Sequence, residues 1–167
     1  MTQTSIWTDR VAIVTGGSSG IGKATALALA EQGAKELITG RTAETLDEVT
    51  AQSDSIKALQ IDSADADSGE RIVAAALSDW GRLDLIVNNS GAGKVMPLPG
   101  YDADSMANLA TINIAAPSLL TKAGHEALKE SKGAVVNIGT AVARNAAPML
   151  AHYAATKAAL DHLTQSW

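Results

Sequence analysis

The chain has 167 residues, enough for one domain with a hydrophobic core and too few for two comfortable ones. Apolar residues make up 46% of it, close to the globular norm, which argues against disorder. The net charge of −5 and the scattered basic residues argue against nucleic acid or an anionic membrane surface as the main partner.

The sequence has no cysteine, which excludes disulfides and thiolate metal sites. No cluster of histidines and carboxylates has metal-ligand spacing, so no metal site is predicted. The first ten residues, MTQTSIWTDR, lack an apolar signal core, and no apolar run approaches membrane-spanning length. We therefore expect a soluble, cytoplasmic protein with no membrane partner.

The first half of the chain alternates short aliphatic runs with helical patterns. Three runs predict buried strands, at Val11–Gly16, Glu36–Gly40 and Ile56–Asp62. A helical pattern follows each of them: Ile21–Gly33, which a glycine ends, then a helix with Thr42 as its N-cap, then Ser68–Trp80.

The second half continues the alternation, with one longer helical stretch. Leu83–Asn89 and Gly133–Gly139 predict the fourth and fifth strands. Between them lie a Gly/Pro-rich loop, Ser90–Gly100, and a helical stretch from about Asp104 to Lys129, in which Pro117 is expected to produce a kink. A sixth helix begins at about Ala151.

Apolar strands that alternate with helices indicate a parallel sheet covered on both faces. Right-handed crossovers then give a doubly wound, Rossmann-like α/β fold, for which we expect the strand order 3-2-1-4-5. We find no internal repeat and no low-complexity linker, so residues 1–167 are predicted to form a single domain.

A glycine-rich turn, TGGSSGIG (Thr15–Gly22), connects the first strand to the first helix. Glycine permits unusual φ angles and close approach of a pyrophosphate, and a helix N-terminus offers free N–H groups to phosphates. The alternative is a turn whose glycines serve only packing, but the strand–turn–helix context favours dinucleotide binding. The expected phosphate-binding residues are Gly16, Ser18, Ser19, Gly20, Ile21 and Gly22.

The spacing of these glycines, T-G-x-x-x-G-x-G rather than G-x-G-x-x-G, resembles the short-chain dehydrogenase/reductase family. The resemblance covers nearly all of the chain, from Val11 to Trp167, and several ordered motifs carry it. It implies an oxidoreductase that uses a nicotinamide cofactor on a small-molecule carbonyl or alcohol substrate.

The end of the second strand bears on the choice of cofactor. An acid at this position accepts hydrogen bonds from the adenosine ribose and favours NAD, whereas a nearby arginine accommodates the 2′-phosphate of NADP. Gly40 stands where the acid would be, and Arg41 follows it. We predict NADP(H) over NAD(H), the alternative being that Arg41 is a solvated surface residue. Asp62 either contacts the adenine, as the resemblance implies, or serves as a turn acid.

The fourth strand ends in Asn88-Asn89-Ser90-Gly91, which resembles the family's Asn-Asn-Ala-Gly with serine in the alanine place. Asparagine side chains here can tie neighbouring strand ends together, and Gly91 lets a cofactor pass close by. Asn89 and Gly91 are therefore predicted to border the cofactor.

Tyr153 and Lys157 lie one helical turn apart, so both side chains emerge on the same face. A free phenol titrates near pH 10, and a nearby ammonium lowers that value toward the range useful for acid–base catalysis. Tyr-x-x-x-Lys occurs by chance in many helices, but its place after a fifth strand identifies it with the family's catalytic pair. The resemblance implies that both residues also contact the cofactor.

Two further positions match the family's catalytic residues. Thr140, just after the fifth strand, stands where the family has a serine, and its hydroxyl can donate to a substrate carbonyl. Asn113 matches the asparagine that interrupts a helix and holds a water in the proton relay, and asparagine is unfavourable within a helix. His152, His125 and His162 are interpreted as bystanders.

The resemblance leaves two hypotheses open. One is an NADP(H)-dependent carbonyl reductase or alcohol dehydrogenase. The other is a catalytically inactive module for dinucleotide binding and oligomerisation, since family members continue past the tyrosine helix and the end at "TQSW" carries no helix-stop signal. We expect a fragment of a longer reductase, with the fifth strand at an exposed sheet edge. Homo-oligomers through the long fourth helix and the tyrosine helix are implied by the resemblance alone.

Overall fold

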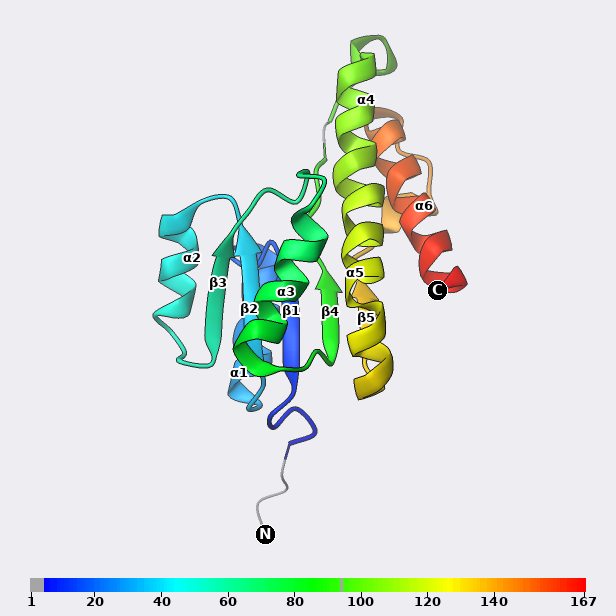
Figure 1. Ribbon diagram of the computed structural model, residues 1–167. Coiled ribbons are helices and arrows are strands. Elements are labelled where there is room, and N and C mark those ends of the chain that lie inside the picture. Colours follow the sequence, from blue (N-terminus) through cyan, green and yellow to red (C-terminus); the bar gives the residue numbers. More distant parts are fainter. Residues whose placement is uncertain (1–4, 94) are drawn as a thin grey trace.

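A computed structural model describes residues 5–93 and 95–167 of the chain (Figure 1). Its five strands form one parallel sheet in the order β3-β2-β1-β4-β5, which confirms the predicted α/β fold and strand order. The strands are β1 (Val11–Thr15), β2 (Lys35–Gly40), β3 (Ile56–Gln60), β4 (Leu85–Asn88) and β5 (Ala134–Asn137).

Six α-helices accompany the strands in the described part of the chain: α1 (Gly20–Glu31), α2 (Ala43–Thr50), α3 (Ser68–Trp80), α4 (Ala103–Ala110), α5 (Ala116–Ser131) and α6 (Ala151–Ser166). Short 3₁₀ turns occupy Leu98–Gly100, Ala141–Ala143 and Pro148–Leu150. In Figure 1, α3 and α5 lie in front of the sheet and α1 lies behind it. The helices therefore cover both faces, as the continuous apolar strands require.

The two faces of the sheet carry separate hydrophobic clusters. The face under α3 and α5 is built around Ile13, Leu37, Ile72, Ile86 and Leu120. The opposite face, under α1 and α2, is built around Val14, Ala26, Ile38, Leu46 and Val87. Alternate residues of β1 and β2 feed alternate clusters, because successive side chains of a strand point to opposite faces.

The long helical stretch has the predicted extent, but its irregularity precedes Pro117. A π-helical turn, Thr111–Ala115, joins α4 to α5, and the Ala116 N–H donates to the Thr111 carbonyl. Pro117 lies in the first turn of α5. Proline has no N–H, so the Asn113 carbonyl lacks its usual helical donor four residues on. The break consequently appears around Asn113 instead of at the proline itself.

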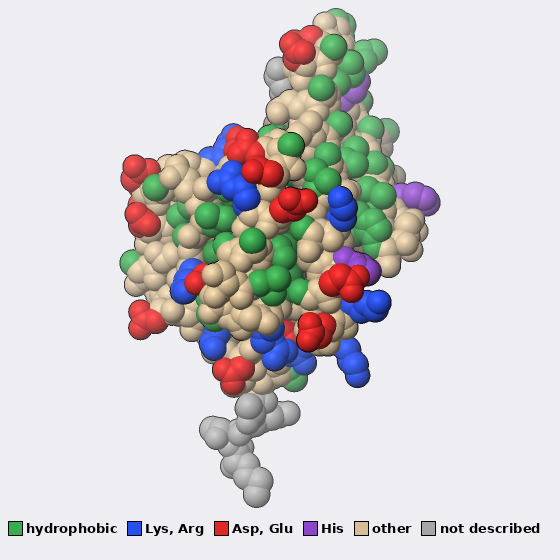
Figure 2. Space-filling view, in the orientation of Figure 1, with side chains coloured by type: hydrophobic (Ala, Val, Ile, Leu, Met, Phe, Trp, Pro, Cys, Tyr) green, Lys and Arg blue, Asp and Glu red, His purple; other side chains and the backbone are tan. Residues whose placement is uncertain are grey.

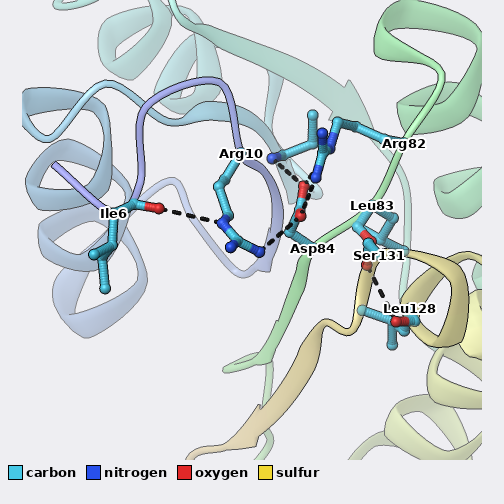
Figure 3. A network of polar contacts seen from close by, with 8 residues as sticks. Ile6, Arg10, Arg82, Leu83, Asp84, Leu128 and Ser131 are labelled. Atoms are coloured by element: carbon cyan, nitrogen blue, oxygen red, sulfur yellow. Dashed lines mark hydrogen bonds and ion pairs between the residues drawn. The ribbon is translucent and has the colours of Figure 1, made fainter. Parts of the chain in front are cut away.

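A buried carboxylate, Asp84, ties the amino ends of β1 and β4 together (Figure 3). It accepts hydrogen bonds from the Val11 backbone N–H at 2.9 Å, from Arg82 at 2.6 and 2.8 Å, and from Arg10 at 3.1 Å. Burial alone would raise the pKa of Asp84, but the bonds from Arg82 and Val11 and the charges of Arg82 and Arg10 hold it below its usual value.

The surface differs between the sheet layers and the column formed by α4 and α5. On the face shown in Figure 2, acidic and basic side chains are interspersed over the layers, while hydrophobic side chains gather along the column. Met106 and Leu119 are 40% and 39% exposed there. β5 forms one edge of the sheet, and its Val136 is 45% exposed. Among the described residues, no helix is both long and apolar enough to span a bilayer.

Candidate active site

A cleft of about 630 Å³ opens at the carboxyl ends of the strands, the edge where doubly wound sheets bind ligands. The glycine turn forms one wall. Gly16 and Gly20 have φ angles of +65° and +52°, a conformation that L side chains rarely adopt. Of the predicted cofactor-binding residues, those that line the cleft are Gly16, Ser18, Ser19, Gly20, Ile21, Arg41, Asp62, Asn89 and Gly91.

Gly22 and Gly17 serve packing instead of the cleft surface. A Cβ on Gly22 would lie 2.3 Å from the Gly16 carbonyl oxygen and 2.5 Å from the Asn89 Nδ2. A Cβ on Gly17 would lie 2.6 Å from the Ile38 Cβ. Different glycines of the same motif thus line the cleft (Gly16 and Gly20) and pack against the chain (Gly17 and Gly22).

The start of α1 fits a phosphate group. Ser19 is the N-cap residue with extended backbone angles, but its side chain makes no capping hydrogen bond, and the first turn holds no acidic residue. Backbone N–H groups at a helix N-terminus carry partial positive charge and bind anions. The residues at this terminus, Ser18 to Ile21, line the cleft. The turn therefore suits the pyrophosphate of a dinucleotide.

The far end of the cleft is bounded by Gly40, Arg41 and Asp62. A Cβ on Gly40 would lie 3.2 Å from the Ser18 hydroxyl, so the glycine leaves room for that group. Arg41 is exposed, and its guanidinium has no hydrogen bond or ion pair with the residues that the structure describes. Asp62 accepts a hydrogen bond from the Ala64 N–H at 3.0 Å, the turn role considered from the sequence, while also lining the cleft.

The two asparagines that end β4 join neighbouring strands. The Asn88 Nδ2 donates to the Asn137 side chain on β5 at 2.7 Å, and the Asn89 Nδ2 donates to the Thr15 carbonyl at 2.9 Å. The Thr15 hydroxyl accepts from the N–H groups of both Asn89 and Ser90, at 3.0 and 2.9 Å. These bonds set the path of the chain as it leaves the sheet toward Gly91.

Tyr153 and Lys157 lie on α6, at the Gly91–Gly93 end of the cleft. A Cβ on Gly91 would lie 3.5 Å from the Lys157 Nζ, and one on Gly93 would lie 3.6 Å from the Tyr153 ring. Both glycines line the cleft. The two separations are ordinary contact distances, so the loop after β4 brings the cleft next to the two side chains.

Lys157 is buried, with 3% of its surface exposed. Its Nζ donates to the Ile138 carbonyl oxygen at 2.8 Å, and burial lowers the pKa of the ammonium. Lys157 also lines a hollow of about 300 Å³ together with Thr140 and Gly139. The structure thus brings Thr140 and Lys157 to one hollow beside the loop after β5.

Asn113 lies in the π-turn and is fully buried. Its Oδ1 accepts from the Ala92 N–H at 2.9 Å, and its Nδ2 donates to the Ala92 carbonyl at 2.8 Å and to the Thr156 hydroxyl at 3.0 Å. The side chain therefore clamps the loop after β4 to α6. The water-holding role that the resemblance implies for Asn113 stays a prediction.

The histidines lie apart from the cleft lining. The His152 ring lies against Tyr101, with centroids 3.9 Å apart, and His125 contacts Glu126 at 2.8 Å. Within residues 5–93 and 95–167, no group of three histidine or acidic side chains is arranged to hold a metal ion.

Some residues that line the cleft were not predicted from the sequence. Ile61, Ser63, Ala92 and Ile112 line the cleft although no motif marks them. Ile112 comes from the π-turn, far along the chain, so no local pattern could have placed it there. Ser63 follows Asp62 directly, and its position after the third strand was the available signal.

The comparisons with known proteins agree with this geometry. The family model for short chain dehydrogenases matches residues 10–167. The chain belongs to the short-chain dehydrogenase/reductase family. As a member, it is similar to the short-chain dehydrogenase/reductase FrzI of Cladobotryum sp, with 37% identity over 95% of this chain and 63% of the relative. An uncharacterized oxidoreductase of Staphylococcus aureus (strain USA300) is 32% identical over 96% of this chain and 71% of its own length.

Solved structures of family members superpose closely. A short-chain dehydrogenase from Streptomyces avermitilis matches with a TM-score of 0.90 and 31% identity, over 99% of this chain and 60% of that one. A metagenomic short-chain oxidoreductase in complex with NADP also gives a TM-score of 0.90, at 32% identity, over 95% of this chain and 75% of that one. The present chain thus spans roughly three-fifths to three-quarters of the length of these four proteins.

Proposed function

We propose that the cleft binds NADP(H), and that the chain is the nucleotide-binding part of a reductase or dehydrogenase acting on a carbonyl or secondary alcohol. The observation that carries the proposal is the cleft itself. It runs from an uncapped helix N-terminus and two positive-φ glycines to glycines that border Tyr153 and Lys157.

The preference for NADP(H) over NAD(H) rests on the second strand. Gly40 supplies no carboxylate for the adenosine ribose, and Arg41 offers a guanidinium without a partner among the described residues. A guanidinium can hold a phosphate through two parallel hydrogen bonds. The metagenomic structural relative was solved in complex with NADP, which adds support from the family.

A bound nicotinamide would supply or accept the hydride. The chain's own residues would manage the proton and the substrate. Tyr153 would give its phenolic proton to the carbonyl oxygen during reduction, and take it back during oxidation. A protonated Lys157 nearby would stabilise the phenolate, and the Thr140 hydroxyl would donate to the carbonyl oxygen. Asn113 would hold α6 against the loop after β4 through its three bonds.

A second candidate function is a dinucleotide-binding and assembly module without turnover. Exposed apolar side chains favour it: Val136 on the free edge of β5, and Met106 and Leu119 on the α4–α5 column. None of these three side chains lines the cleft, so this second candidate assigns binding and assembly to different surfaces.

Titration of NADPH and NADH into the purified chain, followed by calorimetry, tests the binding step. We expect NADPH to bind at least about tenfold more tightly than NADH, with Arg41→Ala removing most of the difference. Binding of neither nucleotide would overturn both candidate functions.

A turnover assay with NADPH and a panel of ketones separates the two candidates. The reductase predicts NADPH oxidation that Tyr153→Phe abolishes while nucleotide binding persists. Tight binding with no turnover on any ketone would favour the module.

A further inference from the structure

The ladder between β2 and β3 ends beside the cleft, and a side chain prolongs it. The last paired residues of the two strands are Gly40 and Gln60. The Ile61 N–H donates to the Gly40 carbonyl at 2.9 Å, as in a regular parallel ladder. One step further, the Gln60 Nε2 donates to the Arg41 carbonyl, also at 2.9 Å. The amide of Gln60 thus stands in for the next rung of the sheet.

This bond fixes the backbone of the residue that carries the guanidinium. Arg41 belongs neither to β2 nor to α2. It is one of the two residues that connect them, and the other, Thr42, is the N-cap of the helix. Its carbonyl is held by Gln60 on one side, and the Thr42 carbonyl accepts from Leu46 and Thr45 on the other. The base of the Arg41 side chain is therefore restrained, while Arg41 lines the cleft and its guanidinium has no partner in the described chain.

When the backbone that carries a charged side chain is already restrained, less conformational entropy is lost as that residue binds an anion. Arginine and lysine lose rotamer freedom when ordered, and a misplaced Cα displaces both N–H groups of a bidentate contact. Gln60 is not among the residues that line the cleft, and the hydrogen bond of its side chain goes to Arg41, which does line it.

We propose that Gln60 is a positioning residue for cofactor selectivity, which holds Arg41 so that its guanidinium meets the 2′-phosphate of NADP(H). The inference rests on the proposed cofactor preference, and it adds a residue outside the cleft to the determinants of that preference. It also predicts that substitution of Gln60 affects only nucleotides that carry the 2′-phosphate.

Calorimetric titration of Gln60→Ala with NADPH and with NADH tests this. We expect the Kd for NADPH to rise about three- to fivefold, the size of one exposed hydrogen bond, with the Kd for NADH unchanged. Gln60→Glu should weaken NADPH binding further, because a carboxylate cannot donate to the Arg41 carbonyl and adds a negative charge near the phosphate. Gln52→Ala is a matched control, since Gln52 is also exposed and its Nε2 donates to the Glu48 carbonyl at 2.7 Å, at the C-terminal end of α2.

The outcomes separate the inference from the proposed function. If the wild-type chain binds NADPH and NADH equally, the cofactor preference itself is wrong. If Arg41→Ala removes a preference that Gln60→Ala leaves intact, only the inference on Gln60 is overturned. Equal weakening of both nucleotides by Gln60→Ala would also overturn it, because a general loss of stability would then explain the effect.

Discussion

The nucleotide cleft at the ends of β1 to β3 and the polar cluster around Lys157 beside β5 lie at the same edge of the sheet, but they are supported differently. All five residues of β1 and four of the six residues of β2 are buried. No residue of β5 is buried, and α6 has only Thr156, Lys157 and Leu160 buried. The cleft is thus carried largely by the two buried strands β1 and β2, with β3 at the sheet edge beside them, whereas the Lys157 cluster is carried by an edge strand and a half-exposed helix.

The difference gives the proposed nucleotide site and the proposed catalytic residues separate supports within one sheet. The cleft depends mainly on hydrophobic burial, which is spread over many side chains. The Lys157 cluster depends on a few polar contacts, from Asn88 to Asn137, from Asn113 to α6 and from Lys157 to Ile138. Single substitutions should therefore separate the two functions.

The largest effect is expected at Asp84, which ties β1 to β4 at the edge of the sheet opposite to both regions. Asp84→Ala removes the carboxylate that binds Val11 on β1 and leaves two arginines beside a buried gap. We expect a loss of about 3–5 kcal/mol in the free energy of unfolding, measured by urea denaturation. Asp79→Ala is the control, because its ion pair with Lys57 is exposed and should contribute less than about 1 kcal/mol. Similar losses for both variants would contradict the role of Asp84.

Asn113→Ala should act more locally, on the Lys157 side. It leaves the Ala92 N–H and carbonyl without their side-chain partner, for an expected cost of about 2–3 kcal/mol. Hydrogen exchange should show the loop after β4 and the first turns of α6 opening more readily than β1. Asn108→Ala, on the exposed side of α4, should leave both unchanged. Uniform loss of protection across the sheet would argue against a local clamp.

Glu36, near the start of β2, is expected to make the stability of the fold depend on pH. It is buried on β2, and neither carboxylate oxygen has a hydrogen-bond partner among the described residues. Burial raises its pKa from 4.5 to about 8, so the native state holds a proton that the unfolded chain releases above pH 4.5. The stability contributed by the protonated acid is present below pH 4.5 and is lost as the pH rises through about 8.

Glu36→Gln tests that sign, because its amide stays neutral at every pH. Between about pH 5 and about pH 9, the wild type should lose on the order of 4 kcal/mol of unfolding free energy relative to this variant. Glu44→Gln, on the exposed first turn of α2, should keep the wild-type slope. Parallel pH profiles for wild type and Glu36→Gln would contradict the prediction.

The smallest expected effect is that of Lys157→Met on the affinity for NADPH. The same variant should abolish any turnover. Methionine fills a similar volume, and the variant removes a buried ammonium whose pKa burial lowers. Because the pyrophosphate and adenosine end of the cleft is built by other elements, the Kd for NADPH should rise less than about tenfold, by calorimetry. Loss of all binding would show that the two regions are not separable.

The sequence predicted the fold because its signals are local. Apolar runs, helix periodicity and the glycine turn each act within a few residues, and parallel topology then places all strand ends at one edge. Arg41, which was assigned to the cofactor from the end of the second strand, lines one cleft together with Asp62, Asn89 and Gly91, which the resemblance suggested. The catalytic roles assigned by resemblance to Tyr153, Lys157, Thr140 and Asn113 stay predictions.

The features that the sequence did not predict depend on contacts between distant residues. Asp84 accepts a hydrogen bond from Val11, which lies 73 residues earlier in the sequence, and no local sequence pattern predicts that contact. Glu36 reads as a polar start of a strand, yet it is fully buried because β2 lies between β1 and β3. Pro117 was expected to kink the helical stretch, and the resemblance implied an interruption at Asn113; the π-turn at Thr111–Ala115 contains Asn113, whose carbonyl lacks the N–H that Pro117 cannot supply.

The glycine turn has a consequence for how such sequences evolve. Ile38 and the Gly16 carbonyl occupy the space that side chains on Gly17 and Gly22 would need, whatever the cleft holds. A descendant that had abandoned its nucleotide would still be selected to keep these two glycines. Gly20 faces open space and is constrained only by its positive φ, so drift toward asparagine or aspartate there would be the earliest trace of a lost ligand.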